Sequence, residues 1–125
     1  MNNKISTRDK GAIGEDIAEK YLKSQGYDIL GRNLSCRYGE IDLVARKKDR
    51  LFFVEIKRRR GNDFGSAIEA VSNIKQKRIR KSAEYFLFKN KEWQKLIPFF
   101  SVVAIDEDLE GCSDPRIEFL PDAFT

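Results

Sequence analysis

The chain has 125 residues, 41% of them hydrophobic, and a formal net charge of +4. This length is typical of one domain, so we expect a single domain over residues 1–125. The absence of histidine excludes Ser-His-Asp and Cys-His catalysis and most zinc sites. Because no apolar run could span a membrane and the polar start does not resemble a signal peptide, we expect a cytoplasmic protein.

The first half of the chain predicts a helix followed by three strands. Ser6 or Thr7 can cap a helix that runs to about Gln25, where Gly26 is a natural stop. "YDILGRN" then predicts a strand. "GEIDLVA" and "RLFFVEIK" predict two more, and the polar "RKKD" between them is typical of a hairpin connection.

The second half predicts another helix and further strands. "RRRGNDFGS" predicts a loop, and Ser72 can cap a helix over about residues 73–89. "PFFSVVAI" and "RIEFL" predict a fourth and a fifth strand. The order helix, three strands, helix, two strands predicts an α/β domain with a mixed central sheet flanked by helices.

The predicted hairpin places acidic side chains opposite one another. If Arg46 pairs with Leu51, then Asp42 faces Glu55, and Glu40 faces Lys57. The opposite face of both strands is then entirely apolar. It carries Ile41, Leu43, Ala45, Phe52, Val54 and Ile56.

Two carboxylates side by side are unfavourable unless a cation lies between them. Carboxylate oxygens are ligands for Mg²⁺ or Mn²⁺, so Asp42 and Glu55 predict a divalent-metal site, with Lys57 placed to orient water or offset charge on a phosphate. A salt-bridge cluster, in which Glu40 and Asp42 share Lys57, is the alternative.

Asp42 followed by Glu55-Ile56-Lys57 resembles the signature of the PD-(D/E)XK nuclease superfamily. The whole chain, with "GAIGEDIAEKYL", "GEIDLVA", "FVEIKRRR" and "VVAID", resembles the YraN family, small bacterial proteins similar to archaeal Holliday junction resolvases. The resemblance implies a restriction-endonuclease-like core. It also implies that Asp42 and Glu55 bind metal, that the Ile56 carbonyl assists, and that Lys57 is catalytic.

Glu15 would be the additional acid that related resolvases carry on the first helix, and a helical wheel places it at the margin of the apolar face. Gln76 occupies a similar margin, where a polar boundary role is equally consistent. The chain departs from the resemblance in two places. Phe99-Phe100-Ser101 replaces an expected Arg-Phe-Asp, and Arg58 replaces a threonine.

The segment from Lys57 to Lys81 carries nine basic residues and two acidic ones, which suggests contact with backbone phosphates. Aromatic residues interleave poorly with these cations, so the sequence predicts no base-stacking platform and favours duplex or branched DNA. The predicted DNA contacts are Arg58, Arg59, Arg60, Lys75, Gln76, Lys77 and Arg78.

The resulting hypothesis is a divalent-metal-dependent, structure-selective endonuclease acting on DNA, for which a homodimer would suit a two-fold junction. The alternative is a nucleic-acid-binding module that keeps the nuclease fold without turnover. A membrane-surface adaptor is disfavoured because the basic helix lacks an exposed apolar face.

Overall fold

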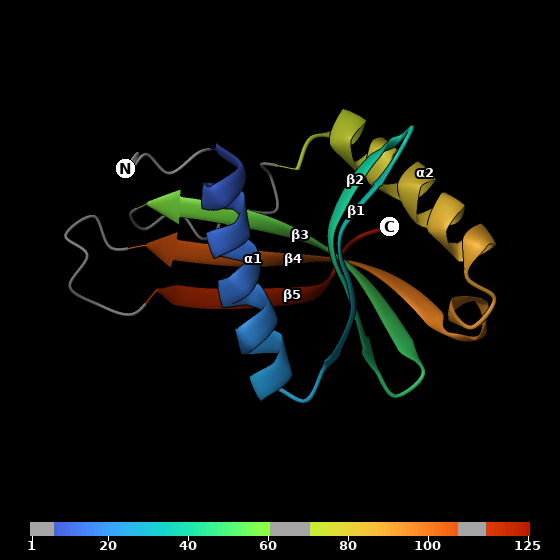
Figure 1. Ribbon diagram of the computed structural model, residues 1–125, viewed down its shortest axis with the longest axis horizontal. Helices are drawn as coiled ribbons and strands as arrows, with labels where there is room; N and C mark the ends of the chain where they lie inside the picture. The colour runs from blue at the N-terminus through green and yellow to red at the C-terminus, as the bar shows by residue number, and fades with distance from the viewer. Residues whose placement is uncertain (1–6, 61–70, 108–114) are drawn as a thin grey trace, which may run out of the picture.

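The chain folds in the predicted order of helix, three strands, helix and two strands, in a computed structural model that describes residues 7–60, 71–107 and 115–125 (Figure 1). A short 3₁₀ turn, η2, was not predicted. The elements are α1 (Thr7–Ser24), β1 (Asp28–Cys36), β2 (Gly39–Lys47), β3 (Arg50–Arg60), α2 (Asn73–Lys89), η2 (Trp93–Lys95), β4 (Ile97–Glu107) and β5 (Arg116–Phe124).

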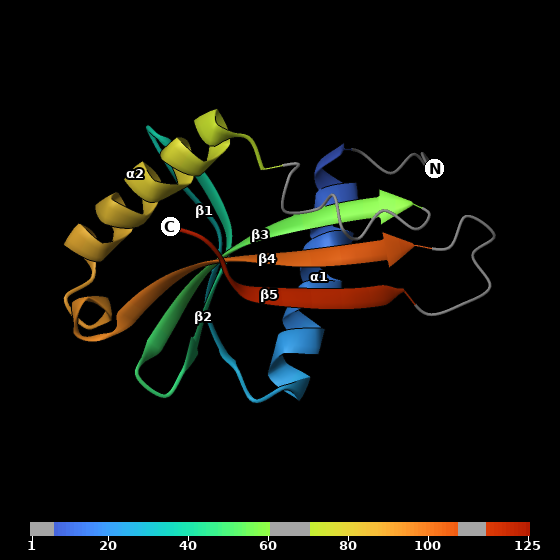
Figure 2. The same cartoon turned by 180° about the vertical axis from the view of Figure 1, so that it is seen from behind.

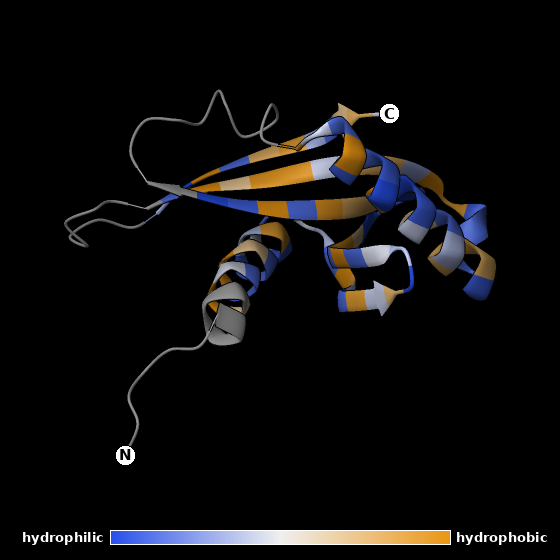
Figure 3. Ribbon diagram, turned by 90° about the horizontal axis from the view of Figure 1, so that it is seen from above, coloured by the Kyte–Doolittle hydropathy of each residue, from blue (hydrophilic) through white to orange (hydrophobic). Residues whose placement is uncertain are grey.

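The strands form one sheet in the order β1-β2-β3-β4-β5, in which β3 and β4 are parallel and all other neighbours are antiparallel. The sheet is therefore mixed, as predicted. The register of the β2–β3 hairpin is confirmed as far as the pair of Leu43 with Val54, because Arg46 pairs with Leu51. The expected pairs of Asp42 with Glu55 and of Glu40 with Lys57 were wrong, because the ladder ends before them. Alternation of polar and apolar residues along the strands is visible as blue and orange bands in Figure 3.

β3 is longer than the sequence predicted. Its pairing with β4 continues to the pair of Arg60 with Glu107, so the backbone of residues 58–60 belongs to the strand. The prediction of a loop from Arg58 was wrong at its start because a parallel neighbour distant in sequence supplies hydrogen-bond partners. The remainder of that predicted loop, residues 61–66, lies outside the described residues.

Each helix covers one face of the sheet, with α1 in front of β3–β5 in Figure 1 and behind them in Figure 2. Ala18 and Leu22 of α1 pack with Phe52 and Val54. Neither described helix, within residues 7–24 and 73–89, is long and apolar enough to span a membrane. The core on the α2 side includes Ile41, Val44, Leu51, Phe53, Ile79, Ala83, Phe86 and Val102.

One face assignment was wrong. Ile41 was expected beside Leu43, but it packs with Val44 in the core on the α2 side. Residues of a regular strand alternate faces, so Ile41 and Val44 can share a face only if β2 changes direction between them. This irregularity lies next to the candidate site.

The residues that depart from the expected Arg-Phe-Asp take part in the core. The ring of Phe99 stacks on Phe52, with centroids 5.4 Å apart, and Phe100 stacks on Phe53 at 6.0 Å. The buried hydroxyl of Ser101 donates to a backbone carbonyl of β5 at 2.5 Å. These side chains therefore support the packing of β4.

Candidate functional site

The candidate site lies where β2 and β3 separate. Their described ladder ends at the pair of Leu43 with Val54. Beyond it, β2 runs beside α2 while β3 continues along β4, so the two strands form a fork (Figure 1). Asp42 and Glu55 are the first residues past the ladder. The N–H of Ile56 donates to Oδ2 of Asp42 at 2.9 Å, so this side chain occupies the place of the lost backbone partner.

Asp42 is held in an environment that disfavours its charge. Burial, followed by the charge of Glu55 nearby, raises the pKa of Asp42 to about 7 from an ordinary value of 3.8. The hydrogen bond from Ile56 opposes this shift only in part. The side chain would become a stable carboxylate if a cation were bound beside it.

Glu55 is buried and is neutralised by two lysines. Its Oε1 forms an ion pair with Nζ of Lys75, and Nζ of Lys57 lies 3.5 Å from the same oxygen. Burial and the neighbouring charge of Lys75 lower the pKa of Lys57. Among the described residues, no ion pair joins Lys57 to Glu40 or Asp42. The predicted salt-bridge alternative was therefore wrong in its partners.

Glu15 projects from α1 and is held by two side chains of β1. Its Oε2 accepts hydrogen bonds from Nε of Arg32 at 3.0 Å and from Nδ2 of Asn33 at 2.6 Å. Asn33 has a φ of 55°, a left-handed conformation that asparagine tolerates better than most residues. Arg32 also contacts Asp16 at 2.7 Å, which anchors the guanidinium to α1. The carboxylate of Glu15 is thus buried in a fixed position.

Three carboxylates meet at the fork, one from α1 and two from β2. One oxygen from each of Glu15, Glu40 and Asp42 lies within 4.8 Å of the other two. An all-oxygen, anionic donor set of this kind suits a hard divalent cation such as Mg²⁺ or Mn²⁺. Glu15 and Asp42 were predicted as ligands, whereas Glu40 was predicted only to face Lys57.

Two cavities meet at Asp42 and Glu55, which line both. The first, the α1-side cavity, has a volume of about 310 Å³ and is bordered by Gly14, Glu15, Asp42, Glu55, Ile56 and Arg58. Every residue that the sequence predicted as a metal ligand therefore borders this cavity.

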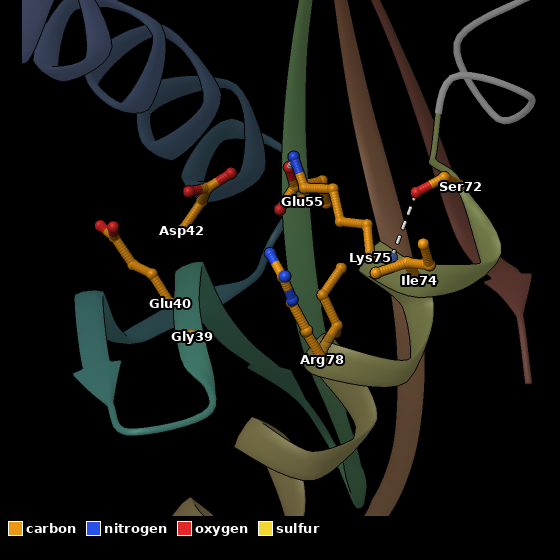
Figure 4. A pocket seen from close by; sticks show the side chains of 9 residues that line it. Gly39, Glu40, Asp42, Glu55, Ser72, Ile74, Lys75 and Arg78 are labelled. Carbon is orange, nitrogen blue, oxygen red and sulfur yellow. Dashed lines mark hydrogen bonds and ion pairs between the residues drawn. The ribbon is translucent and has the colours of Figure 1, made fainter.

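The second, the α2-side cavity, has a volume of about 470 Å³ and is shown in Figure 4, where Lys75 and Arg78 reach from α2 toward Glu55. Lining residues are Gly39, Glu40, Asp42, Glu55, Ser72, Ile74, Lys75, Arg78 and Ile79. This cavity combines the acids of the fork with cations from the helix.

The predicted DNA contacts lie partly at the two cavities and partly elsewhere. Arg58 borders the α1-side cavity, and Lys75 and Arg78 border the α2-side cavity. Lys77 is exposed elsewhere on α2, while Nε2 of Gln76 donates to a backbone carbonyl just before the helix at 3.0 Å. The side chains of residues 59 and 60 lie outside the described part of the chain.

Sequence reasoning missed the supports of Glu15 and the position of Glu40. Arg32 and Asn33 end the predicted strand "YDILGRN", and their polarity was the only available signal. Nothing in their spacing relates them to a helix 17 and 18 residues earlier. Glu40 lies two residues before Asp42, but its approach to Glu15 depends on the irregularity of β2.

Comparisons with known proteins place the chain among bacterial relatives of similar length. Residues 14–105 match the sequence model of "Uncharacterised protein family UPF0102". A UPF0102 protein of Dictyoglomus turgidum is 43% identical over 99% of this chain and 100% of its own length. A UPF0102 protein of Pseudomonas aeruginosa is 40% identical over 99% of this chain and 98% of its own length. A UPF0102 protein of Rhodococcus jostii is 45% identical over 91% of this chain and 94% of its own length.

Proposed function

Because this chain belongs to the uncharacterised protein family UPF0102, whose description assigns no activity, we propose from its site that it is a divalent-metal-dependent phosphodiesterase acting on DNA. The observation that carries the proposal is the fork, where Glu15, Asp42 and Glu55 surround one cavity with Lys57 beside Glu55. Titratable groups whose pKa values are shifted by burial and by each other's charges, as at Asp42 and Lys57, cluster at functional sites.

The ion would be held by Asp42 together with Glu15 and Glu55, and the carbonyl of Ile56 would complete the protein ligands. All four residues border the α1-side cavity. A divalent ion there would supply positive charge that polarises the phosphoryl group and acidifies the attacking water. Glu40 is the competing third acid, since it shares the 4.8 Å cluster with Glu15 and Asp42 but is exposed.

The protein's own groups would then guide hydrolysis. The water oxygen forms a bond to phosphorus, and the bond from phosphorus to the leaving sugar oxygen breaks. Only the unprotonated form of Lys57, which burial and Lys75 favour by lowering its pKa, can take the proton of the attacking water at Nζ. Solvent protonates the leaving oxygen. Arg58 and Arg78, at the two cavities, would hold the flanking phosphates.

One observation favours a second candidate, a DNA-binding module without turnover. Glu55 already has two lysine partners, so this half of the site carries its own cations. If the lysines remained on Glu55, the protein would bind phosphates without holding a metal through that residue. The two functions differ in whether a divalent ion is required.

The test is incubation of the purified protein with duplex, flap, single-stranded and four-way DNA in the presence of Mg²⁺, Mn²⁺ or EDTA. We expect cleavage of at least one substrate with metal, none with EDTA, and none by Asp42→Asn. Asp122→Asn, a matched change at an exposed acid of β5, should retain activity. DNA binding without cleavage under every condition would favour the binding module.

A further inference from the structure

A third cavity lies beside α2. We call this cavity the aromatic groove. Its volume is about 300 Å³, and its lining residues are Tyr38, Lys81, Glu84, Tyr85 and Phe88. Phe88 is 79% exposed, more than any other large hydrophobic side chain among the described residues. An exposed aromatic ring beside a cavity is typical of a binding surface.

Cations surround the rings of this groove. The guanidinium of Arg37 lies 4.8 Å from the centroid of the Tyr38 ring, and Nζ of Lys81 lies 5.9 Å from it. Nζ of Lys89 lies 5.7 Å from the ring of Tyr85. Among the described residues that line the cavity, Glu84 is the only acid. The groove thus combines stacking surfaces with net positive charge, which complements an anionic ligand with flat rings.

The groove adjoins the candidate site through the β1–β2 hairpin. Gly39 lines the α2-side cavity, and its neighbour in sequence, Tyr38, lines the groove. On α2, Arg78 lines the α2-side cavity, and Lys81, one helical turn further on, lines the groove. Gly39 has a φ of +147°, a backbone conformation that residues with a side chain rarely adopt. Glycine at this position therefore permits the backbone conformation of the hairpin that carries Tyr38, which lines the groove together with residues of α2.

We propose that the aromatic groove binds unpaired nucleotides of the DNA strand that enters the fork. The inference rests on the proposed function, because it assumes that DNA lies across the α2-side cavity. Bases would stack on Phe88 and Tyr85, and Lys81, Lys89 and Arg37 would contact the adjoining phosphates. Such a groove would select substrates with a single-stranded segment next to the cleavage point.

The sequence had predicted no base-stacking platform, because the aromatic residues are not interleaved with the basic ones along the chain. The groove forms only when Tyr38 of the hairpin lies beside α2. A second copy of the chain is the competing occupant, because Phe88 could equally anchor an apolar interface. Binding of a DNA strand in the groove would require its bases, whereas binding of a second copy of the chain would not.

The experiment measures binding by fluorescence anisotropy in EDTA, so that cleavage does not interfere. Three labelled probes are compared: an oligothymidylate, a strand of abasic residues with the same number of phosphates, and a blunt duplex. Phe88→Ala should weaken oligothymidylate binding about fivefold or more and leave the abasic strand and duplex unchanged. A Phe88→Trp variant should bind oligothymidylate as the unmodified protein does. Ile97→Ala, a change at a half-exposed apolar residue of β4, should leave binding to all three probes unchanged.

Equal loss on all three probes, or no loss on oligothymidylate, would overturn the inference while leaving the proposed function standing. A Phe88→Ala variant that changes only from dimer to monomer in sedimentation would assign the groove to a second copy and also overturn it. Failure of the unmodified protein to bind oligothymidylate would also overturn the inference, and failure to bind duplex, flap and four-way DNA as well would remove the proposed function itself.

Discussion

At the scale of single residues, the main feature is an acid whose charge the fold does not satisfy. Asp42 accepts one backbone hydrogen bond, but burial and Glu55 together outweigh it. Glu55 differs because two lysines lie within ion-pair distance. Of two adjacent acids, one is therefore neutralised internally and the other would gain most from an added cation.

The first prediction concerns the pH dependence of stability. The pKa of Asp42 is about 7 in the folded protein and near 3.8 when unfolded, so the folded state binds the proton more tightly. The resulting stabilisation is complete below the unfolded pKa and is lost as pH rises through the folded pKa. In EDTA, Asp42→Asn should flatten this decline, as measured by urea unfolding over a pH series. An unchanged slope would show that the folded-state pKa is not raised.

The second prediction concerns Lys57. Because Lys75 also neutralises Glu55, Lys57→Ala should leave the fold and metal affinity nearly unchanged while cleavage is lost. Circular dichroism, denaturant unfolding and the cleavage assay on one preparation test this. Lys57→Arg, which keeps the charge but cannot accept a proton, should remain inactive. Lost stability with intact cleavage would make Lys57 a structural residue instead.

At the scale of elements, the fork and the start of α2 assemble the site. Oγ of Ser72 accepts a hydrogen bond from the N–H of Lys75 at 3.2 Å, and Gln76 binds the carbonyl of Val71. These contacts fix the first turn of α2, from which Lys75 reaches the α2-side cavity, and Arg78 reaches it from the second turn. The helix therefore presents its cations at the point where β2 leaves β3.

The third prediction distinguishes the two strands of the fork as metal ligands. Glu55 of β3 is buried and shares the α1-side cavity with Asp42, whereas Glu40 of β2 is exposed. Glu55→Gln should therefore weaken Mn²⁺ binding in titration calorimetry more than Glu40→Gln does. The reverse order would assign the ion to the cluster of Glu15, Glu40 and Asp42 and leave Glu55 to its lysines.

At the scale of the whole molecule, cations approach the fork from both sides. Arg58 borders the α1-side cavity, which is next to α1, and Arg78 borders the α2-side cavity. A DNA backbone crossing the fork would contact both. Because Arg58 lies on β3 and Arg78 on α2, the proposed DNA-binding surface depends on both elements.

The fourth prediction follows from this arrangement. Each phosphate contact contributes about 0.9 to the slope of log affinity against log salt concentration for duplex DNA. Arg58→Ala and Arg78→Ala should each reduce the slope by up to about that amount, and the double variant by the sum. Lys91→Ala, an exposed cation beyond α2, is the matched control. If only the control changed the slope, the DNA surface would lie elsewhere.

The order of elements, the register of the β2–β3 hairpin and the residues around the α1-side cavity were predictable from the sequence. Hydrophobic periodicity and turn residues are local signals, and Asp42, Glu55 and Lys57 lie on consecutive strands whose pairing a short loop determines. Glu15 was accessible too, because its place on the margin of α1 follows from helical geometry.

Other features depended on contacts between segments distant in sequence. The extension of β3 to Arg60 required its pairing with β4, and the position of Ile41 required β2 to bend at the fork. The pairing of Lys75 with Glu55, and the meeting of Tyr38 with α2, required the helix to pack beside the hairpin. Local patterns determine which elements form and which face is apolar; only tertiary packing decides where strands part and which charges meet there.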